Sequence, residues 1–144
     1  TPQEIYARPV NLFVASFIGN PSINIITGRL ERDSRGLHFH SGDLDIAVGA
    51  REALSPFAGR EMSIGIRPEA LQPGTGPFAG RVEYVENLGG ESILHLRVGQ
   101  HPLVSRLPGA VHRVSCGDHL SLCADPDAIH FFHRGIRVDQ GDTP

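Results

Sequence analysis

The chain has 144 residues, 13 basic and 16 acidic, so its formal net charge at pH 7 is -3. Every basic residue is arginine, and the absence of lysine excludes a P-loop lysine, a lysine Schiff base and a lysine general base. The slightly negative charge gives no general attraction to phosphate backbones or anionic lipid, which argues against a nucleic-acid-binding protein. The length suffices for one sizeable core or two small ones.

The two cysteines and the N-terminal residues indicate in which cellular compartment the protein is expected. Cys116 and Cys123 form neither a CxxC pair nor the framework of a small disulfide-rich domain, so we expect a reduced cytoplasmic protein with buried, inert thiols. No run approaches the roughly 18 apolar residues that a membrane span needs. Residues 1–4 lack the features of a signal peptide, and we expect the chain to be a fragment of a longer protein.

Residues 1–19 have the pattern of two short helices. Thr1 is a candidate N-cap, Pro2 fits the first helical position and Glu4 completes a capping box. A second helical run over residues 11–18 has an apolar face too wide for a solvated helix, so it needs a partner to pack against.

A hinge or domain boundary is predicted at Gly19, Asn20 and Pro21, where glycine and proline end the helical periodicity. From residue 23 onward, Gly, Pro and Asp interrupt short runs rich in Val, Ile, Leu and Phe, which is typical of an all-β protein. The predicted strands are residues 24–31, 37–40, 44–48, 62–67, 80–87, 92–98, 102–106, 119–123 and 128–132. Short strands without long helices favour one barrel or two small barrels over a parallel sheet.

Glycine and proline also mark the expected connections. Residues 72–77, Gln-Pro-Gly-Thr-Gly-Pro, are predicted to be a linker or long turn, so a break between two barrel units would fall near residues 72–79. Their glycines lack the GxGxxG spacing of a dinucleotide site. Further turns are predicted at residues 35–36, 98–100 and 124–127.

Arg67, Pro68 and Glu69 form a candidate contact site. Pro68 keeps Arg67 out of the helical region, and Arg67 offers a planar donor fork to a partner or ligand. We favour the interpretation that Arg67 and Glu69 anchor a strand-to-loop corner, since structural ion pairs produce the same charge placement.

Histidine is the other abundant chemical group. His38 and His40 are expected on one face of a strand, with Asp43 the only evident helper, whereas a metal site needs three or four converging ligands. We therefore predict solvated strand faces and no metal site.

Glutamates and aromatic residues suggest no further chemistry. Glu83, Glu86 and Glu91 have no accompanying nucleophile or histidine motif, so we interpret them as lining exposed sheet edges. An oligonucleotide-binding barrel needs stacking aromatics and a basic groove, but Phe131 and Phe132 lie in an apolar run that a core explains.

Four segments share one family pattern. Residues 1–19 read Thr-Pro-x-Glu-x-Tyr-x-x-Pro-x-x-x-Phe-Val-Ala-x-Phe-Ile-Gly, residues 65–69 read Gly-Ile-Arg-Pro-Glu, residues 85–91 contain Glu-x-Leu-Gly, and residues 129–132 contain His-x-Phe. These segments resemble the C-terminal end of ATPase subunits from bacterial sugar-type ABC importers, the group of the maltose and glycerol-3-phosphate importer ATPases. Three positions depart from the family pattern of Met, His and an acidic residue: Ile23, Ala70 and His133.

The resemblance implies a mainly β chain with an OB-fold-like, transport-associated (TOBE) β-barrel unit preceded by short N-terminal helices. It implies that residues 1–19 close the ATPase domain, residues 20–138 form the regulatory β domain and residues 139–144 are a flexible tail. The implied function is a non-catalytic regulatory and dimerisation domain of the ATP-binding subunit of an importer for carbohydrates or glycerol-3-phosphate. The candidate interface or regulatory residues are Arg67, Glu69, Asn87 and Gly89.

The same resemblance implies partners and a location. The partners would be a second copy, the membrane permease subunits through the parent protein, and a regulatory protein or small ligand, on the cytoplasmic face of the bacterial plasma membrane. The sequence has no Walker A, Leu-Ser-Gly-Gly-Gln signature or Walker B motif, so we expect no catalysis, metal or cofactor here, with ATP and Mg in the missing ATPase domain. The alternative is a small-ligand or oxyanion-sensing barrel of the molybdate type, with backbone amides of residues 88–91 holding the anion.

Overall fold

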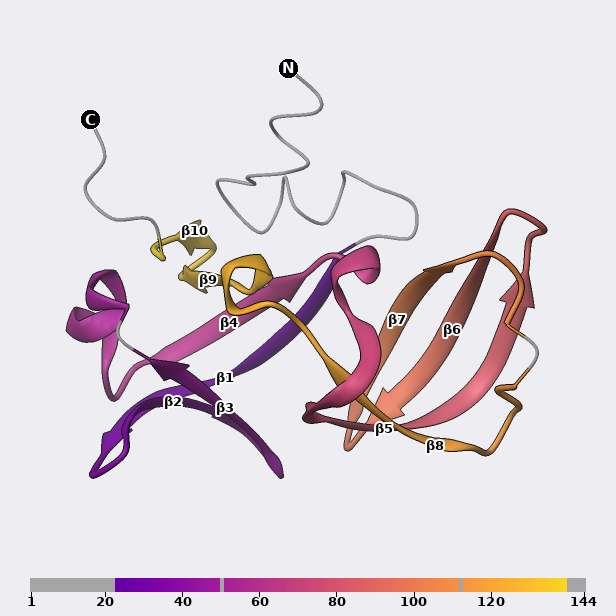
Figure 1. Ribbon diagram of the computed structural model, residues 1–144. Helices are drawn as coiled ribbons and strands as arrows, with labels where there is room; N and C mark the ends of the chain where they lie inside the picture. Colours follow the sequence, from indigo (N-terminus) through magenta and orange to yellow (C-terminus); the bar gives the residue numbers. More distant parts are fainter. Residues whose placement is uncertain (1–22, 50, 112, 140–144) are drawn as a thin grey trace, which may run out of the picture.

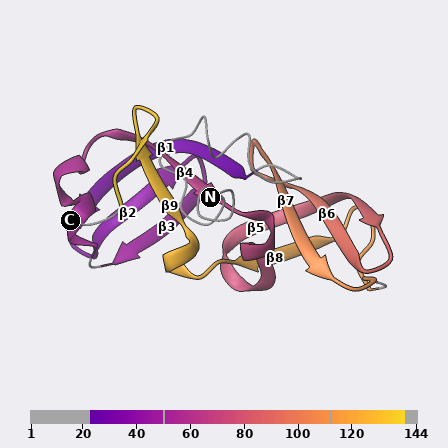
Figure 2. The same cartoon turned by 90° about the horizontal axis from the view of Figure 1, so that it is seen from above.

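The computed structural model describes residues 23–49, 51–111 and 113–139, which form two antiparallel sheets lying side by side (Figures 1 and 2). Sheet A has the strand order β10-β9-β4-β1-β2-β3, and sheet B has the order β7-β6-β5-β8. The strands of sheet A are β1 (Asn24–Asp33), β2 (Gly36–Ser41), β3 (Leu44–Gly49), β4 (Glu61–Ile66), β9 (His130–His133) and β10 (Ile136–Arg137). The strands of sheet B are β5 (Gln72–Asn87), β6 (Glu91–Val98), β7 (His101–Pro108) and β8 (His119–Cys123). Three short 3-10 helices lie in the connections: η1 (Glu52–Phe57), η2 (Pro68–Ala70) and η3 (Pro126–Ala128).

Alternation of apolar and polar residues explains why these segments form strands. In β3, Leu44, Ile46 and Val48 are buried and the residues between them are exposed. This period of two turns one side of the strand toward the interior. Buried side chains from both sheets form one contiguous apolar core.

The chain builds most of sheet A, then all of sheet B, and then returns to sheet A. On the return, β9 pairs with β4 so that Phe131 lies opposite Ile64. The buried ring of Phe131 meets the ring of Phe39 edge-on, with 6.1 Å between centroids. The last two strands of sheet A, β9 and β10, therefore come from residues that follow all of sheet B in the sequence.

Arg51, directly before η1, fixes the returning segment. Its guanidinium donates hydrogen bonds to the carbonyl oxygens of Ile129, at 2.9 Å, and Pro126, at 2.7 Å. The same group lies 5.5 Å from the centroid of the Phe131 ring. One side chain thus satisfies two carbonyl groups at η3 and packs on the strand that follows.

Comparison with the sequence-based predictions confirms the mainly β class, and each predicted strand overlaps an observed one. The two-residue strand β10 has no predicted counterpart, because so short a segment shows no periodicity. The predicted linker at residues 72–77 is wrong: these residues begin β5, which pairs with β8 on both sides of a bulge. The chain changes sheets at η2, ahead of the break expected near residues 72–79.

Other predictions fall on the ends of the chain. The N-terminal helices of residues 1–19, the hinge at residues 19–21 and the tail at residues 140–144 lie outside the described residues. Asp139, the first residue of the predicted tail, packs against the fold: its side chain is 2% exposed and lies 2.7 Å from Nε of Arg137. Within the described ranges, no helix is long and apolar enough to cross a membrane.

The outer side of β7, an edge strand of sheet B, is closed by a side chain of sheet A. Asn24 in β1 donates from Nδ2 to the carbonyl of Val104 and accepts at Oδ1 from the Val104 N–H, both at 2.8 Å. Pro102 and Pro108, which lie in phase with Val104 along β7, have no N–H to leave unpaired. This arrangement blocks pairing with a foreign strand and ties the two sheets together.

We expect Asn24→Ala to lower the free energy of unfolding by about 2 kcal/mol, because Asn24 is buried and its loss leaves two backbone groups of Val104 without these bonds. Urea unfolding followed by far-UV circular dichroism measures the change. Asn87→Ala, at the exposed last position of β5, is the control and should cost less than about 1 kcal/mol. Equal losses in the two variants would contradict this account of Asn24.

Candidate functional site

Arg67, the first of the predicted contact residues, lies in the interior. It is 6% exposed, and its backbone is extended directly before Pro68, with φ -63° and ψ 145°. Its carbonyl accepts a hydrogen bond from the N–H of Ala70 at 3.0 Å, within η2. This burial favours the structural corner over a direct contact with another protein.

Glu69 belongs to a charge network at the edge of sheet B. Arg106 in β7 lies between two carboxylates, 3.7 Å from Glu69 and 3.3 Å from Glu91. Gln72 donates from Nε2 to the carbonyls of Glu69, at 2.7 Å, and Arg106, at 3.0 Å, which holds η2 against β7. Partly exposed pairs of this kind are screened by solvent and contribute roughly 1 kcal/mol, so the network matters for the surface charge more than for stability.

Asn87 is the last residue of β5, and Gly89 lies in the turn between β5 and β6. Oδ1 of Asn87 accepts from the N–H of Gly89 at 3.1 Å, and the N–H of Leu88 donates to the carbonyl of Glu91 at 2.9 Å. Gly89 has φ +87°, a conformation that favours glycine. The turn therefore holds a defined shape and presents Leu88, which is 57% exposed, to solvent.

A surface hollow of about 460 Å³ joins Glu69 to this turn. The residues that line it include Glu69, Gln72, Gly90, Glu91 and Arg106. Asn87, at the end of β5, and Gly89, in the adjoining turn, do not line the hollow, and Arg67 does not line it either. The structure thus brings Glu69 close to the turn that the sequence singled out and separates Arg67 from both.

Sequence reasoning missed the cross-strand pairs on the outer face of sheet B. Glu83 lies 3.3 Å from Nε of Arg97, and Glu86 contacts Nε2 of His95. The ring of His95 stacks on Tyr84 with 4.0 Å between centroids. Glu83 and Glu86 are exposed as expected, but the interpretation that they line sheet edges is wrong, because β5 and β6 are the two inner strands of sheet B.

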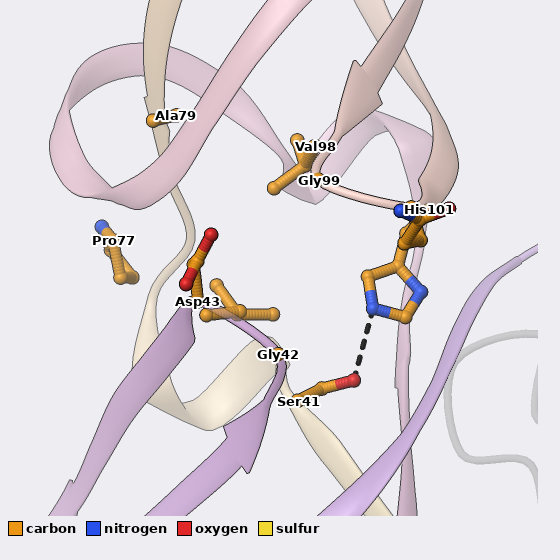
Figure 3. Close-up of a pocket in the computed structure, with 10 residues that line it drawn as sticks. Ser41, Gly42, Asp43, Pro77, Ala79, Val98, Gly99 and His101 are labelled. Carbon is orange, nitrogen blue, oxygen red and sulfur yellow. Dashed lines mark hydrogen bonds between the residues drawn. The ribbon is translucent and has the colours of Figure 1, made fainter.

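A second cavity, of about 530 Å³, lies where the turn between β2 and β3 faces sheet B (Figure 3). At its rim, Ser41 Oγ donates to the carbonyl of Thr27 at 2.8 Å and lies 2.9 Å from Nε2 of His101. Because the hydroxyl has one proton, Nε2 of His101 is the donor in the second bond. Sequence reasoning did not single out this pair, since its members are 60 residues apart and neither belongs to a motif.

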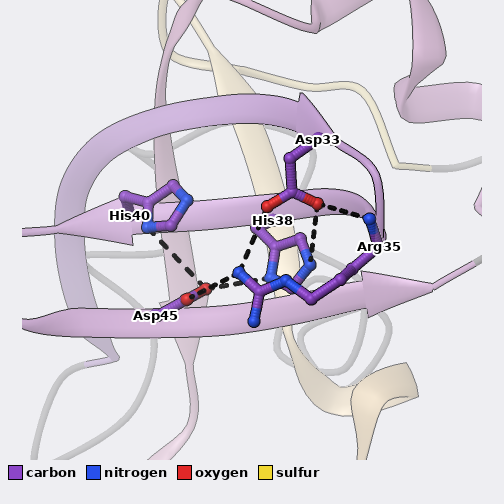
Figure 4. A network of polar contacts seen from close by, with 5 residues as sticks. All are labelled: Asp33, Arg35, His38, His40 and Asp45. Carbon is purple, nitrogen blue, oxygen red and sulfur yellow. Dashed lines mark hydrogen bonds and ion pairs between the residues drawn. The ribbon is translucent and has the colours of Figure 1, made fainter.

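His38 and His40 share one face of β2, as predicted, with 6.0 Å between ring centroids (Figure 4). Their acidic partners are Asp33 and Asp45 rather than the expected Asp43. Nδ1 of His38 lies 3.0 Å from Asp45, and its Nε2 lies 3.6 Å from Asp33. Figure 4 shows the histidine rings and both carboxylates converging beside the hairpin of β1 and β2.

Arg35 neutralises these carboxylates. Its guanidinium lies 3.1 Å from Asp33 and 3.7 Å from Asp45. Its backbone N–H donates to Asp33 at 2.7 Å, and this hydrogen bond lowers the pKa of Asp33. Among the described residues, no three or more His, Cys, Asp or Glu side chains are arranged to hold a metal ion.

The expectation that both cysteine thiols are buried is wrong. Cys116 is exposed and donates from Sγ to the carbonyl of Glu83 at 2.9 Å, and Cys123 is half-buried. Both are free cysteines.

Two domain families match this chain. The MalK OB fold domain matches residues 19–71, and the TOBE domain matches residues 64–132. The two matches overlap around η2, where the chain passes from sheet A to sheet B.

Curated relatives extend this match. The chain is 37% identical over 136 residues to the sn-glycerol-3-phosphate import ATP-binding protein UgpC of Paraburkholderia xenovorans, covering 91% of this chain and 37% of the relative. It is 37% identical over 135 residues to UgpC of Escherichia coli O157:H7, covering 92% of this chain and 37% of that protein. It is 35% identical over 142 residues to the uncharacterized ABC transporter ATP-binding protein YurJ of Bacillus subtilis, covering 91% and 38%.

The chain therefore spans little more than a third of the length of these relatives. The OB-fold and TOBE class expected from the sequence is confirmed. With both domains matched in succession and nine-tenths of the chain aligned to these proteins, the chain belongs to the TOBE and MalK OB-fold family found in ATP-binding subunits of ABC importers.

Proposed function

We propose that this chain is a non-catalytic regulatory and dimerisation domain of the ATP-binding subunit of an ABC importer for carbohydrates or glycerol-3-phosphate. The proposal rests on the match of residues 19–132 to two successive domains, together with relatives named as glycerol-3-phosphate import ATP-binding proteins. The sequence contains no lysine and hence no P-loop lysine. ATP and Mg would bind in the ATPase domain of the parent protein, and this chain would supply neither cofactor binding nor catalysis.

The proposed role is mechanical. Two copies would stay in contact through this domain while their ATPase domains open and close, and a regulatory protein or ligand would act by binding one arrangement more tightly. The parent protein would associate with membrane permease subunits, which would hold it at the cytoplasmic face of the plasma membrane. Residues 19–21 would act as the hinge.

The proposed contact surface combines Glu69 with Asn87 and the turn that contains Gly89. Two features support it: the half-exposed carboxylate of Glu69 borders the hollow, and the neighbouring turn exposes Leu88. An apolar tip beside a charged rim is the usual composition of a protein contact. Arg67 would support this surface from the interior.

Sedimentation equilibrium of the 144-residue chain over a wide concentration range tests the dimerisation part. We expect a reversible dimer, and we expect Glu69→Arg to weaken its association by about tenfold through charge reversal at the contact. Glu52→Arg is the matched control, because Glu52 is likewise the acidic residue in the first turn of a 3-10 helix, at η1 on sheet A.

The outcomes separate the parts of the proposal. Equal weakening by both charge reversals would remove Glu69 from the contact, and a strict monomer would refute self-association through this domain alone. Circular dichroism of each variant is needed alongside, because Glu69→Arg also places a second cation near Arg106.

The oxyanion-sensing alternative finds less support at the turn of residues 88–91. The hollow beside that turn carries two carboxylates, Glu69 and Glu91, and both lie within 4 Å of the guanidinium of Arg106. Like charges so placed disfavour a bound anion. A thermal-shift titration with molybdate checks this, since a native-state ligand must raise the melting temperature.

A further inference from the structure

The cavity between the sheets has the size and construction of a small-molecule site. Its volume of about 530 Å³ lies within the range of roughly 300–1,000 Å³ typical of ligand pockets. Its lining comes from the β2–β3 turn of sheet A and from β5 and the β6–β7 turn of sheet B (Figure 3). Segments far apart in the sequence therefore face one another across it.

Charge limits what this cavity can hold. None of its lining residues is arginine, and the only carboxylate among them is Asp43. Figure 3 shows the Asp43 carboxylate directed into the space bordered by Pro77, Ala79 and Gly99. An anion would meet this carboxylate with no guanidinium to offset it, so phosphate esters and carboxylic acids are disfavoured.

The remaining lining favours a molecule with both hydroxyl groups and C–H surface. The carboxylate of Asp43 accepts hydrogen bonds, and the Gln100 side chain both donates and accepts them. Pro77 and Ala79, both exposed, give the opposite wall apolar character. Polar groups on one side and apolar carbon on the other match the two faces of a sugar ring.

The rim is already held in place without a ligand. Ser41 uses its proton on Thr27, and His101 donates to Ser41, so these groups join the two sheets rather than wait for a partner. Gly42 and Gly99, with φ of +60° and +61°, set the two turns that face the cavity. A preformed rim reduces the ordering cost of binding.

We propose that the cavity binds a small, uncharged polyhydroxylated molecule of about the size of a hexose, with its hydroxyl groups donating to Asp43 and its C–H face on Pro77 and Ala79. Such a ligand would contact both sheets at once and would favour the arrangement in which they are closed against each other. The inference goes beyond the proposed function and does not depend on it, because the binding is tested on this chain alone.

The test is a titration of the isotope-labelled 144-residue chain, followed by the amide NMR signals of Gly42 and Gly99. The probes are two matched pairs, D-glucose with glucose 6-phosphate and glycerol with glycerol 3-phosphate, together with ethanolamine as a cationic probe. We expect saturable shifts of both glycine signals with D-glucose, at least about tenfold weaker binding of each phosphate ester, and no tighter binding of ethanolamine.

Two variants locate the site. Ala79→Leu fills the cavity from an exposed strand position and should abolish the D-glucose shifts, whereas Ala47→Leu, at an exposed position of β3 outside the lining, should leave them unchanged. Asp43→Asn keeps the shape of the side chain, removes its charge and should weaken binding about tenfold. Unfolding midpoints show that each variant is folded before it is titrated.

Three results would overturn the inference. The first is the absence of saturable shifts with either neutral probe at about 100 mM, which is already far weaker than a functional site requires. The second is tighter binding of either phosphate ester than of the matching neutral probe, or tighter binding of ethanolamine than of D-glucose and glycerol. The third is an equal response of Ala79→Leu and Ala47→Leu, because the signal would then not arise from this cavity.

Discussion

Gly28→Ala is expected to prevent stable folding, with a loss of about 3 kcal/mol or more in the free energy of unfolding. Gly28 lies in β1 at an inward position, and a methyl group there would come within 2.8 Å of the Phe39 ring and closer still to the carbonyl oxygen of His40. The carbonyl belongs to the paired strand β2, so relief of this clash requires backbone movement in the centre of sheet A. Far-UV circular dichroism and urea unfolding measure the result.

Gly90→Ala is the matched control for Gly28→Ala. A methyl group at Gly90 meets no atom within 4 Å, and Gly90 is not among the glycines with positive φ. Its replacement should leave stability within about 1 kcal/mol of the parent chain, through the reduced entropy of the unfolded state. If Gly28→Ala unfolds at the same urea concentration as Gly90→Ala, the close packing of β1 on β2 is not as described here.

Asp139→Asn is the second large effect, with an expected loss of about 3 kcal/mol. The carboxylate is almost fully buried and lies 2.7 Å from Nε of Arg137, 3.9 Å from Arg51 and 3.9 Å from Nδ1 of His130. Removal of its charge leaves these buried groups without their common anion. The same cluster holds the returning segment that forms β9, so sheet A loses its last strands first.

The acid sensitivity of this cluster follows from the pKa of Asp139. Burial raises this pKa, but the hydrogen bond from Arg137 and the nearby positive charges of Arg137 and His130 outweigh burial and hold it below its usual value. A lowered folded-state pKa gives stability that is complete above the unfolded-state value and is lost as the pH falls through the folded-state value. Stability of the parent chain should therefore decline below about pH 4 more steeply than that of Asp139→Asn.

Urea unfolding at several pH values between about 2 and 6 measures this difference. Asp127→Asn, at an exposed position in η3, is the control and should keep the pH dependence of the parent chain. Parallel pH profiles for the parent and Asp139→Asn would show that the carboxylate does not carry the predicted linkage.

Strand positions followed from the sequence because their signals are local. The alternation of Leu44, Ile46 and Val48, and the turn at Gly99 between β6 and β7, occupy a few adjacent residues each. The misassigned segment at residues 72–77 shows the limit of such signals. Its prolines and glycines are those of a linker, yet pairing with β8 holds it in sheet B because the bulge absorbs the irregular backbone.

The candidate site was predictable only in part. Glu69 and the turn around Gly89 were singled out from a family pattern, and the structure places both near one hollow. Arg67 belongs to the same pattern, but its burial depends on how η2 packs against β7. The inter-sheet cavity was missed, since Asp43 and His101 come to line one cavity only after the sheets have met.

The sequence by itself determined the β class, the strands and turns, and the family, because each is written in neighbouring residues or in a short motif. Only the tertiary structure decided which strands pair, that Asn24 closes the edge of β7 from 80 residues away, and that Asp139 is buried at the end of the described chain. No local pattern in the sequence, such as the alternation of apolar and polar residues, relates the residues that these contacts join. Their stability comes from burial and from complementary hydrogen bonds that exist only once both sheets are in place.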